Sequence, residues 1–229
     1  MDQGGVGRRA SVTEPLEQLY EARFDEREIS AKQGVWDEIA RYLQRYVDPA
    51  LPLLDLACDR GHFVRAITAS ERWATDIRDM RAALPDDVRF VQSSGLDLAT
   101  ALPAAHFGSI FMSNYLEHLA SADAVIEQLT IVRQLLAPGG RVIVLQPNIR
   151  LVGSRYWDFI DHRVALTERS LLEAAELAGL ATDELTTRFL PYSTKGRLPA
   201  ARLLVRAYLA FPLAWRIMGK QTLYVGVRA

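Results

Sequence analysis

Residues 53–63 of the chain read LLDLACDRGHF and combine a short apolar run, a tight loop and the first residues of a helix. A short apolar run of this kind is typical of a strand that helices cover on both faces of a sheet. The loop after it brings backbone N–H groups and a helix N-terminus to the end of the strand. The stretch therefore predicts a ligand site at the carboxyl edge of a parallel sheet.

Outward from this stretch, strands and helices are expected to alternate. The predicted helices span residues 15–29, 33–47, 61–69, 79–84 and 122–136, with one more between Thr167 and Gly179. The predicted strands span residues 51–57, 73–76, 88–91, 107–113, 141–145, 180–189 and 223–227. Ser121 and Thr167 suit helix N-caps, and Gly179 suits the position past a helix end. Such alternation requires an α/β fold with a mostly parallel sheet and right-handed crossovers.

The overall composition is typical of a folded chain with almost no net charge. Its 229 residues suit one domain with a substantial apolar core. We expect a flexible tail over residues 1–13 and one domain over residues 14–229, with a helical insertion at about 193–219. A formal net charge of −1 makes nucleic-acid substrates improbable. A single cysteine, Cys58, with no apolar leader and no long apolar span, predicts a cytoplasmic protein.

A second acidic residue, Asp76, ends the next predicted strand, about 20 residues after Asp55. A carboxylate at this spacing can accept hydrogen bonds from both ribose hydroxyls of a bound nucleoside. Nicotinamide-binding folds share the spacing, so it predicts a ribose site and leaves the reaction open. A nicotinamide-dependent oxidoreductase is one alternative, although the full Gly-x-Gly-x-x-Gly fingerprint is missing.

Two later segments distinguish among the enzyme classes that bind a nucleoside at such a site. They are residues 107–119, FGSIFMSNYLEHL, and residues 136–143, LAPGGRVI. With Asp55 and Asp76, they resemble the ordered motifs of class I S-adenosylmethionine-dependent methyltransferases, in particular bacterial small-molecule and glycan methyltransferases with a Glu-His-Leu motif. The resemblance implies a Rossmann-like, seven-stranded, mostly parallel sheet flanked by helices, with an antiparallel last strand. It also implies S-adenosylmethionine as the cofactor.

The first motif of that family has an acidic residue followed by Gly-x-Gly-x-Gly. Here Asp55 and Gly61 match, whereas Ala57 and Asp59 replace the earlier glycines. By resemblance, the methionine part of the cofactor would contact Asp55, Ala57 and Gly61, and the ribose would contact Asp76. Asn114, at the end of the fourth predicted strand, would face the amino acid end of the cofactor.

The adenine contact departs from the family pattern. Many relatives place an Asp against the adenine amino group after the third strand, and the matching position here is Ser94. We therefore expect the adenine contact at Ser94, the adjacent Gly95 or the nearby Asp97.

Methyl transfer to a hydroxyl requires alignment of donor and acceptor and removal of a proton, for which histidine is the natural base near neutral pH. His118 lies just past the fourth predicted strand, and His162 lies between the fifth strand and the next helix, where loops commonly cover the acceptor in this fold. Each neighbours a carboxylate, Glu117 or Asp161. The candidate catalytic residues are His162 as base, His118 as an acceptor contact, and Asp161. The alternative is that both histidines only stabilise helix starts.

A metal site at the same residues is a further hypothesis. Oxygen and imidazole ligands suit Mg²⁺ or Mn²⁺, and a divalent cation would orient a vicinal diol. The side chains concerned are Glu117, His118, Asp161 and His162. We expect the other histidines, His62 and His106, to be an exposed helix residue and a turn residue.

The C-terminal part suggests an acceptor. Residues 190–195, LPYSTK, and 218–221, MGKQ, resemble bacterial methyltransferases of polysaccharide and glycolipid assembly, so the expected acceptor is a saccharide or glycolipid hydroxyl. A non-sugar natural product or a quinone-like hydroxyl is the alternative. A non-enzymatic alternative is a methyltransferase fold that serves as a partner subunit, because two motif glycines are missing.

The predicted insertion carries an apolar stripe at helical spacing, made by Leu204, Tyr208, Phe211 and Trp215. Such a stripe is expected to pack in the core, as a lid on the substrate cleft or in a homodimer contact. The alternative is docking at the inner face of the membrane, close to a lipid-linked acceptor.

Overall fold

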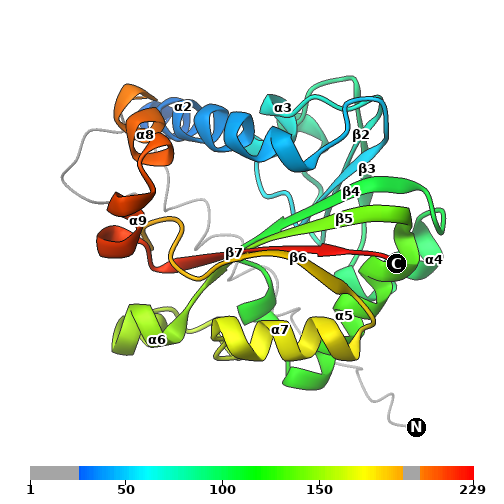
Figure 1. Cartoon of the computed structure of the whole chain (residues 1–229). Helices are drawn as coiled ribbons and strands as arrows, with labels where there is room; N and C mark the ends of the chain where they lie inside the picture. Colours follow the sequence, from blue (N-terminus) through cyan, green and yellow to red (C-terminus); the bar gives the residue numbers. More distant parts are fainter. Residues whose placement is uncertain (1–25, 193–201) are drawn as a thin grey trace, which may run out of the picture.

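The computed structural model describes residues 26–192 and 202–229, and its centre is one seven-stranded sheet (Figure 1). The strand order is β3-β2-β1-β4-β5-β7-β6. The strands are β1 (Leu53–Leu56), β2 (Arg72–Asp76), β3 (Val88–Gln92), β4 (Phe107–Ser113), β5 (Leu136–Pro147), β6 (Ala181–Thr186) and β7 (Gln221–Val227). Only β7 runs antiparallel to its neighbours, which confirms the predicted Rossmann-like sheet.

The parallel register sets where the site lies. β1 pairs with β2 on one side and with β4 on the other, so the carboxyl ends of all three strands meet at one edge. The chain order reverses at β1, and ligands of open α/β sheets bind at such a switch point. Asp55, Asp76 and the residues that follow Ser113 are thereby brought to the same edge.

Helices cover both faces of the sheet (Figure 1). One face carries α2 (Glu26–Leu43), α3 (His62–Ala66), α8 (Arg202–Ala210) and α9 (Pro212–Met218), which share one buried apolar cluster with the strands. The other face carries α4 (Leu98–Ala101), α5 (Ala122–Leu135) and α7 (Glu168–Leu177), which share a second. A short helix, α6 (Ile149–Val152), follows β5.

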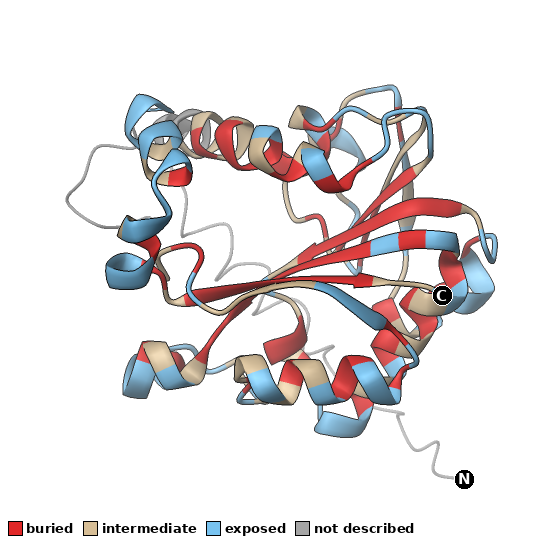
Figure 2. Cartoon of the chain, viewed as in Figure 1, coloured by how far each residue is buried: buried red, intermediate tan, exposed pale blue. Residues whose placement is uncertain are grey.

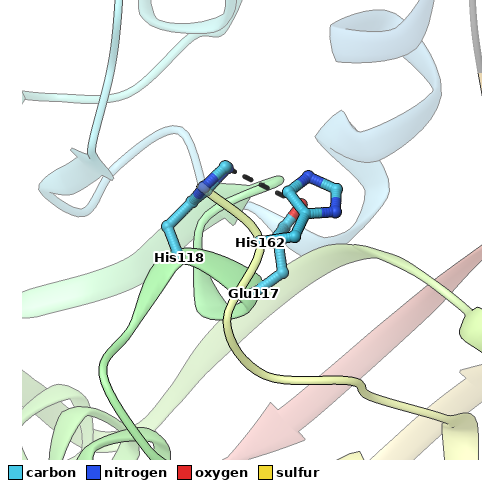
Figure 3. Close-up of side chains that lie close together, drawn as sticks. All are labelled: Glu117, His118 and His162. Carbon is cyan, nitrogen blue, oxygen red and sulfur yellow. Dashed lines mark ion pairs between the residues drawn. The ribbon is translucent and has the colours of Figure 1, made fainter. Parts of the chain in front are cut away.

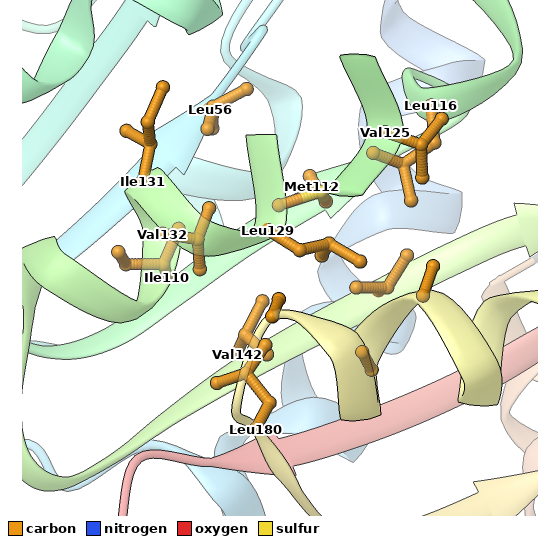
Figure 4. Packing of buried hydrophobic residues seen from close by; sticks show 14 of the residues in the cluster. Leu56, Ile110, Met112, Leu116, Val125, Leu129, Ile131, Val132, Val142 and Leu180 are labelled. Atoms are coloured by element: carbon orange, nitrogen blue, oxygen red, sulfur yellow. The ribbon is translucent and has the colours of Figure 1, made fainter. Parts of the chain in front are cut away.

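The central strands are buried on both faces of the sheet, whereas the edge strands β3 and β6 are partly exposed. Figure 2 shows the central strands buried along most of their length, with the outer surfaces of the helices exposed. On the α5 face, Leu129 and Val132 pack towards Ile110, Met112 and Val142 of the strands (Figure 4). Each fully buried aliphatic side chain of this size contributes roughly 1.5–3 kcal/mol.

Helix ends follow the predicted caps. The Ser121 Oγ accepts from the Ala124 N–H at 3.2 Å, and Thr167 forms a reciprocal capping box with Ser170. Gly179 follows α7 with a φ of 76°, the left-handed conformation that glycine adopts without strain.

Four predicted helices differ from the structure. A single helix, α2, runs through residues 29–33, where two were predicted, because nothing there breaks a helix. The predicted helix at 79–84 is only a 3₁₀ turn, Arg81–Ala83, since the Asp79 carboxylate accepts from the Arg81 N–H and Pro85 follows. α3 stops at Ala66, because the Gln44 side chain pairs with the Thr68 backbone.

The predicted insertion is helical where it is described, and Pro212 separates α8 from α9. Glu38 of α2 is buried and accepts from Arg41 at 2.8 Å and from Arg206 at 3.0 and 3.3 Å, which fixes α8 on α2. A Cβ at Gly34 would lie 3.0 Å from the Arg202 Cγ, so this glycine permits the close approach.

The predicted tail over residues 1–13, most of the predicted helix at 15–29, and residues 193–201 of the insertion lie outside the described residues. Within residues 26–192 and 202–229, no helix combines the length and the apolar character needed to cross a membrane.

Candidate functional site

The loop after β1 retains the backbone of a glycine-rich loop with fewer glycines. Ala57, Asp59 and Gly61 have φ values of 56°, 48° and 70°, all in the left-handed region. A side chain in that region costs roughly 1–2 kcal/mol. The loop therefore has a backbone that favours glycine at the two positions where the sequence departs from the glycine-rich motif.

Two carboxylates meet beside this loop. Asp55 is 3% exposed, and its Oδ2 accepts from the Val64 N–H at 3.2 Å. Asp76 is 7% exposed, and its Oδ2 accepts from the Asp59 N–H at 3.1 Å. The tips of β1 and β2 are thus joined directly, as the predicted nucleoside site requires.

Arg78 also contacts these carboxylates, and sequence reasoning missed it. Its backbone N–H and Nε donate to the Asp76 Oδ1 at 3.0 Å, and its Nη2 donates to the Asp76 Oδ2 at 3.2 Å. The same Nη2 reaches the Asp59 Oδ1 at 3.0 Å. The signal in the sequence was a basic residue two positions after the predicted ribose ligand.

The carboxyl groups beside this loop differ in their pKa. Burial raises the pKa of Asp55 to about 8, and the charges of Asp76 and Asp59 add to this rise. The pKa of Asp59 is lowered, because Lys32 and Arg78 outweigh the opposing effect of burial. Near neutral pH Asp55 therefore holds its proton, whereas Asp59 is ionised.

The predicted adenine side lies after β3. Ser94 caps a 3₁₀ turn by accepting from the Leu96 N–H at 3.3 Å, and Asp97 is exposed. A Cβ at Gly95 would lie 2.0 Å from the Tyr115 hydroxyl, so only glycine fits there. Next to Asp76, the side chain of Ile77 is 61% exposed, which leaves an apolar surface at this edge.

Asn114 marks the end of β4. Its φ is 49°, its N–H donates to the Leu145 carbonyl at 2.9 Å, and its Nδ2 donates to the Ser113 Oγ at 2.9 Å. The sharp turn directs residues 115–118 across the edge of the sheet. Tyr115 then donates to the Gln128 Oε1 at 2.8 Å, and the charge of Asp76, after burial, raises its pKa.

A second cluster forms past Tyr115. Glu117, His118 and His162 offer ligand or base atoms that all lie within 4.8 Å of one another (Figure 3). The His118 and His162 ring centres are 5.0 Å apart, and the His118 Nε2 lies 4.0 Å from the Glu117 Oε1. Asp161 joins from the other side, with its Oδ2 3.5 Å from the His118 Nδ1.

Backbone contacts bring the two halves of this cluster together. The Glu117 carbonyl accepts from the N–H groups of Arg163 and Val164, at 2.7 and 3.1 Å. The His118 Nδ1 pairs with the Asp161 carbonyl at 3.1 Å. The segment after β5 is thereby held against the end of β4, which places the predicted catalytic residues side by side.

The cluster is partly desolvated. Burial and then the charge of His118 lower the pKa of His162, so its ring is neutral near pH 7. Glu117 is fully buried, which raises its pKa. Among the described residues, the Glu117 Oε1 and the His162 Nδ1 have no hydrogen-bond partner.

Two further residues of this cluster were not predicted. Gln146 of β5 is 2% exposed and donates to the Glu117 Oε2 at 3.1 Å. Tyr192 has a raised pKa of about 12, from burial and then from the charge of Glu117. Neither stood out in sequence, because a Gln within a strand and a Tyr within a loop have no characteristic spacing.

One histidine was wrongly predicted. His62 is 6% exposed, not a solvent-facing helix residue, and its Nδ1 pairs with the Gln33 Oε1 at 2.8 Å. The cause is α2, which packs over α3 and covers it. His106 lies in the loop before β4, 3.8 Å from Glu71.

The family model described as a methyltransferase domain matches residues 22–185, more than half of the chain. The chain belongs to this methyltransferase family. The methyltransferase uses S-adenosylmethionine as its cofactor. A search of curated protein sequences gave no match.

Solved structures share the fold of this methyltransferase. A SAM-dependent methyltransferase from Archaeoglobus fulgidus is similar with a TM-score of 0.63 and 17% identity, over 92% of this chain and 99% of the other. The methyltransferase bound to the Haloferax volcanii Trm112 activator has a TM-score of 0.65 and 19% identity, over 89% and 94% of the two chains.

A geranyl diphosphate C-methyltransferase from Streptomyces coelicolor, solved with Mg²⁺ and S-adenosyl-L-homocysteine, has a TM-score of 0.58 and 16% identity, over 83% and 76%. At these identities the likeness establishes the fold alone.

The residues at the edge of the sheet fit the cofactor. The loop after β1 has left-handed backbone at three positions, and a positively charged ligand group would favour ionisation of the buried Asp55 carboxyl beside it. The Asp76 carboxylate accepts from the Asp59 N–H and from the backbone and guanidinium of Arg78, and ribose hydroxyls bound there would have to replace the guanidinium.

Proposed function

We propose that this methyltransferase transfers a methyl group to a hydroxyl of a small molecule, and that the acceptor is a saccharide or a glycolipid precursor. The observation that carries the proposal is the cluster of His118, His162 and Asp161, at the same edge of the sheet as Asp55 and Asp76. An acceptor held at this cluster lies next to the cofactor site.

The cofactor is assigned to the first half of this edge. Asp55, Ala57 and Gly61 take the methionine part, and Asp76 takes the ribose hydroxyls. Asn114, on the turn after β4, faces the amino acid end. Adenine is assigned to Ser94, Gly95 and Asp97, because these residues follow β3 beside the exposed Ile77.

S-adenosylmethionine supplies a methyl group on a positively charged sulfur. The protein must hold the acceptor oxygen in line with that group and remove its proton. The buried Nδ1 of His162 has no partner among the described residues, and a neutral ring can accept the proton there. His118, oriented by Asp161, contacts the acceptor.

The test is a His162→Gln variant assayed with labelled S-adenosylmethionine and a panel of sugars, lipid-linked sugars and phenols. Loss of a general base lowers kcat by about 10²–10⁴. Binding of S-adenosylhomocysteine should stay unchanged, and His106→Gln, outside the cluster, should retain full activity. An unchanged kcat for His162→Gln would refute the assignment of the base.

The acceptor panel separates the alternatives. Methylation of phenols alone would replace the saccharide proposal by a quinone-like or other non-sugar acceptor. Cofactor binding without any methylation would favour a partner subunit. Carbon-linked methyl groups in the product would refute O-methylation.

An exposed apolar surface supports a lipid-linked acceptor. Leu203, Phe211, Leu213 and Ile217 of α8, α9 and their junction are 74%, 56%, 57% and 81% exposed. Beside them lies an open hollow of about 520 Å³, and Arg188 and Arg216 are among the residues that line it. Apolar side chains flanked by arginines suit an anionic lipid surface.

The residues of the predicted apolar stripe differ in burial. Leu204 is 50% exposed, whereas Trp215 is 8% exposed and packs in the core. Flotation with liposomes containing anionic lipid tests membrane contact, and an Ile217→Glu variant should reduce retention. Absence of retained wild-type protein would leave core packing or a homodimer contact as the role of these helices.

A further inference from the structure

We infer that Glu117, His118 and His162 form a site for one divalent transition-metal cation. Figure 3 shows the three side chains converging from the turn after β4 and the segment after β5. Their ligand atoms lie within 4.8 Å of one another. Ligands 2.0–2.2 Å from a tetrahedral cation lie about 3.4 Å apart, so side-chain shifts of about 1 Å would complete the site.

The hydrogen bonds leave one lone pair on each side chain for a cation. The His118 Nδ1 lies 3.1 Å from the Asp161 carbonyl, so it carries the proton and leaves Nε2 as an acceptor. The Glu117 Oε2 accepts from Gln146, which leaves Oε1. Metal-binding histidines commonly donate their other N–H to a carbonyl or carboxylate in this way.

Burial supplies an independent observation. Glu117 is 0% exposed, and its Oε1 has no partner among the described residues, as is true of the His162 Nδ1. No Arg or Lys of the described residues forms an ion pair with Glu117. The ion-pair contact of Glu117 is the His118 imidazole at 4.0 Å, which carries charge only when it is protonated. A buried carboxylate without a permanent positive charge beside it is costly, and a bound cation would remove that cost.

The donor set selects the type of cation. Two imidazoles and one carboxylate suit Zn²⁺, Mn²⁺ or Fe²⁺, whereas Mg²⁺ prefers oxygen ligands alone. Three protein ligands leave coordination positions open. Two adjacent hydroxyls of a sugar could occupy them, and this last step rests on the proposed function.

The cation would change the role of His162. With the cation bound, Nδ1 would be unavailable as a base, so cation binding and the general-base role proposed above are alternative uses of the same His162 nitrogen. A bound cation would make a coordinated hydroxyl more acidic, and the hydroxyl proton would then leave to water instead of to His162. Removal of the cation should therefore affect methyl transfer and leave binding of S-adenosylhomocysteine unchanged.

The experiment measures cation binding by the full chain without any methyl transfer. Chelator-treated protein is titrated with Co²⁺, followed by visible absorption, and Zn²⁺ is then added as competitor. We expect one equivalent of cation per chain, with the absorption of a nitrogen- and oxygen-coordinated Co²⁺. Glu117→Gln and His162→Gln should each bind Co²⁺ at least about tenfold more weakly.

The controls keep the result clear. His106→Gln lies outside the cluster and should bind Co²⁺ like the wild type, and every variant should retain its circular dichroism spectrum and its binding of S-adenosylhomocysteine. His118→Gln replaces either variant if that variant fails to fold. No Co²⁺ binding at 100-fold excess over protein, or equal affinities in all variants, would overturn the site. Cation binding with methyl transfer unchanged after chelation would overturn its role at the acceptor.

Discussion

Ala57 and Asp59 occupy backbone conformations that the family motif assigns to glycine, with φ values of 56° and 48°. Retention of the loop shape despite the substitutions means that the surrounding contacts stabilise it. The Cys58 N–H donates to the Thr75 carbonyl at 2.9 Å, and the Asp59 N–H donates to Asp76. The strained loop is therefore held by the neighbouring strand.

Ala57→Gly should stabilise the protein. Relief of the left-handed strain gains roughly 1–2 kcal/mol, and the extra freedom of glycine in the unfolded chain removes about 0.4–1 kcal/mol of that. We expect a net gain of about 0.5–1 kcal/mol in urea unfolding. Ala207→Gly, the same change on the exposed side of α8, should instead cost about 1 kcal/mol. Equal losses in both variants would contradict the strain.

Asp55 should make the cofactor-free protein less stable as pH rises. Its pKa is raised to about 8 in the folded chain and lies near 3.9 when unfolded, so the folded state holds a proton that the unfolded state has lost between these values. The stabilising effect of that proton is complete below pH 4 and is lost as pH rises towards 8.

Asp55→Asn keeps the acceptor for the Val64 N–H and does not titrate. Its free energy of unfolding should exceed that of the wild type by an amount that grows from pH 4 to pH 8, at most about 1.4 kcal/mol per pH unit. Chemical unfolding at several pH values measures this difference. Parallel pH profiles for the two proteins would show that Asp55 titrates normally.

At the scale of elements, α8 depends on one buried acid. Glu38 accepts from arginines of both α2 and α8, and the apolar contacts of α8 rest mainly on Leu209, which is 6% exposed. α8 should therefore detach before the sheet unfolds.

Glu38→Gln should loosen α8. The neutral amide leaves Arg206 without its charged acceptor, and we expect a loss of about 1–3 kcal/mol. Hydrogen exchange over residues 202–210 should rise more than exchange over α5, and trypsin should cut sooner within α8. Glu173→Gln, an exposed change on α7, should alter neither. Uniform acceleration across the chain would argue against a local role.

At the scale of the whole molecule, ligand binding should be visible in thermal stability. S-adenosylhomocysteine at 100 times its Kd adds about 2.7 kcal/mol, because it binds only the folded chain. For a chain of this size the Tm should rise by roughly 5–10 °C. NADH at the same concentration should leave the Tm unchanged, and a larger shift with NADH would point to a nicotinamide site.

Much of the fold could be predicted, because its strands are buried on both faces and appear as nearly continuous apolar runs. The strand 107–113 matches β4 residue for residue, and the caps at Ser121 and Thr167 form as expected. Two predictions were wrong because a distant side chain or helix replaced a local signal. Gln44 ends α3 in this way, and α2 buries His62.

The sequence by itself determined that acidic residues would end two adjacent parallel strands, since the position of Asp55 and Asp76 within each strand is a local property. Tertiary structure alone decided that His162 and Asp161 meet His118 and Glu117. The physical reason is that these contacts depend on loop backbones paired across long separations, as when the Glu117 carbonyl accepts from Arg163. No periodicity in the chain records such pairing.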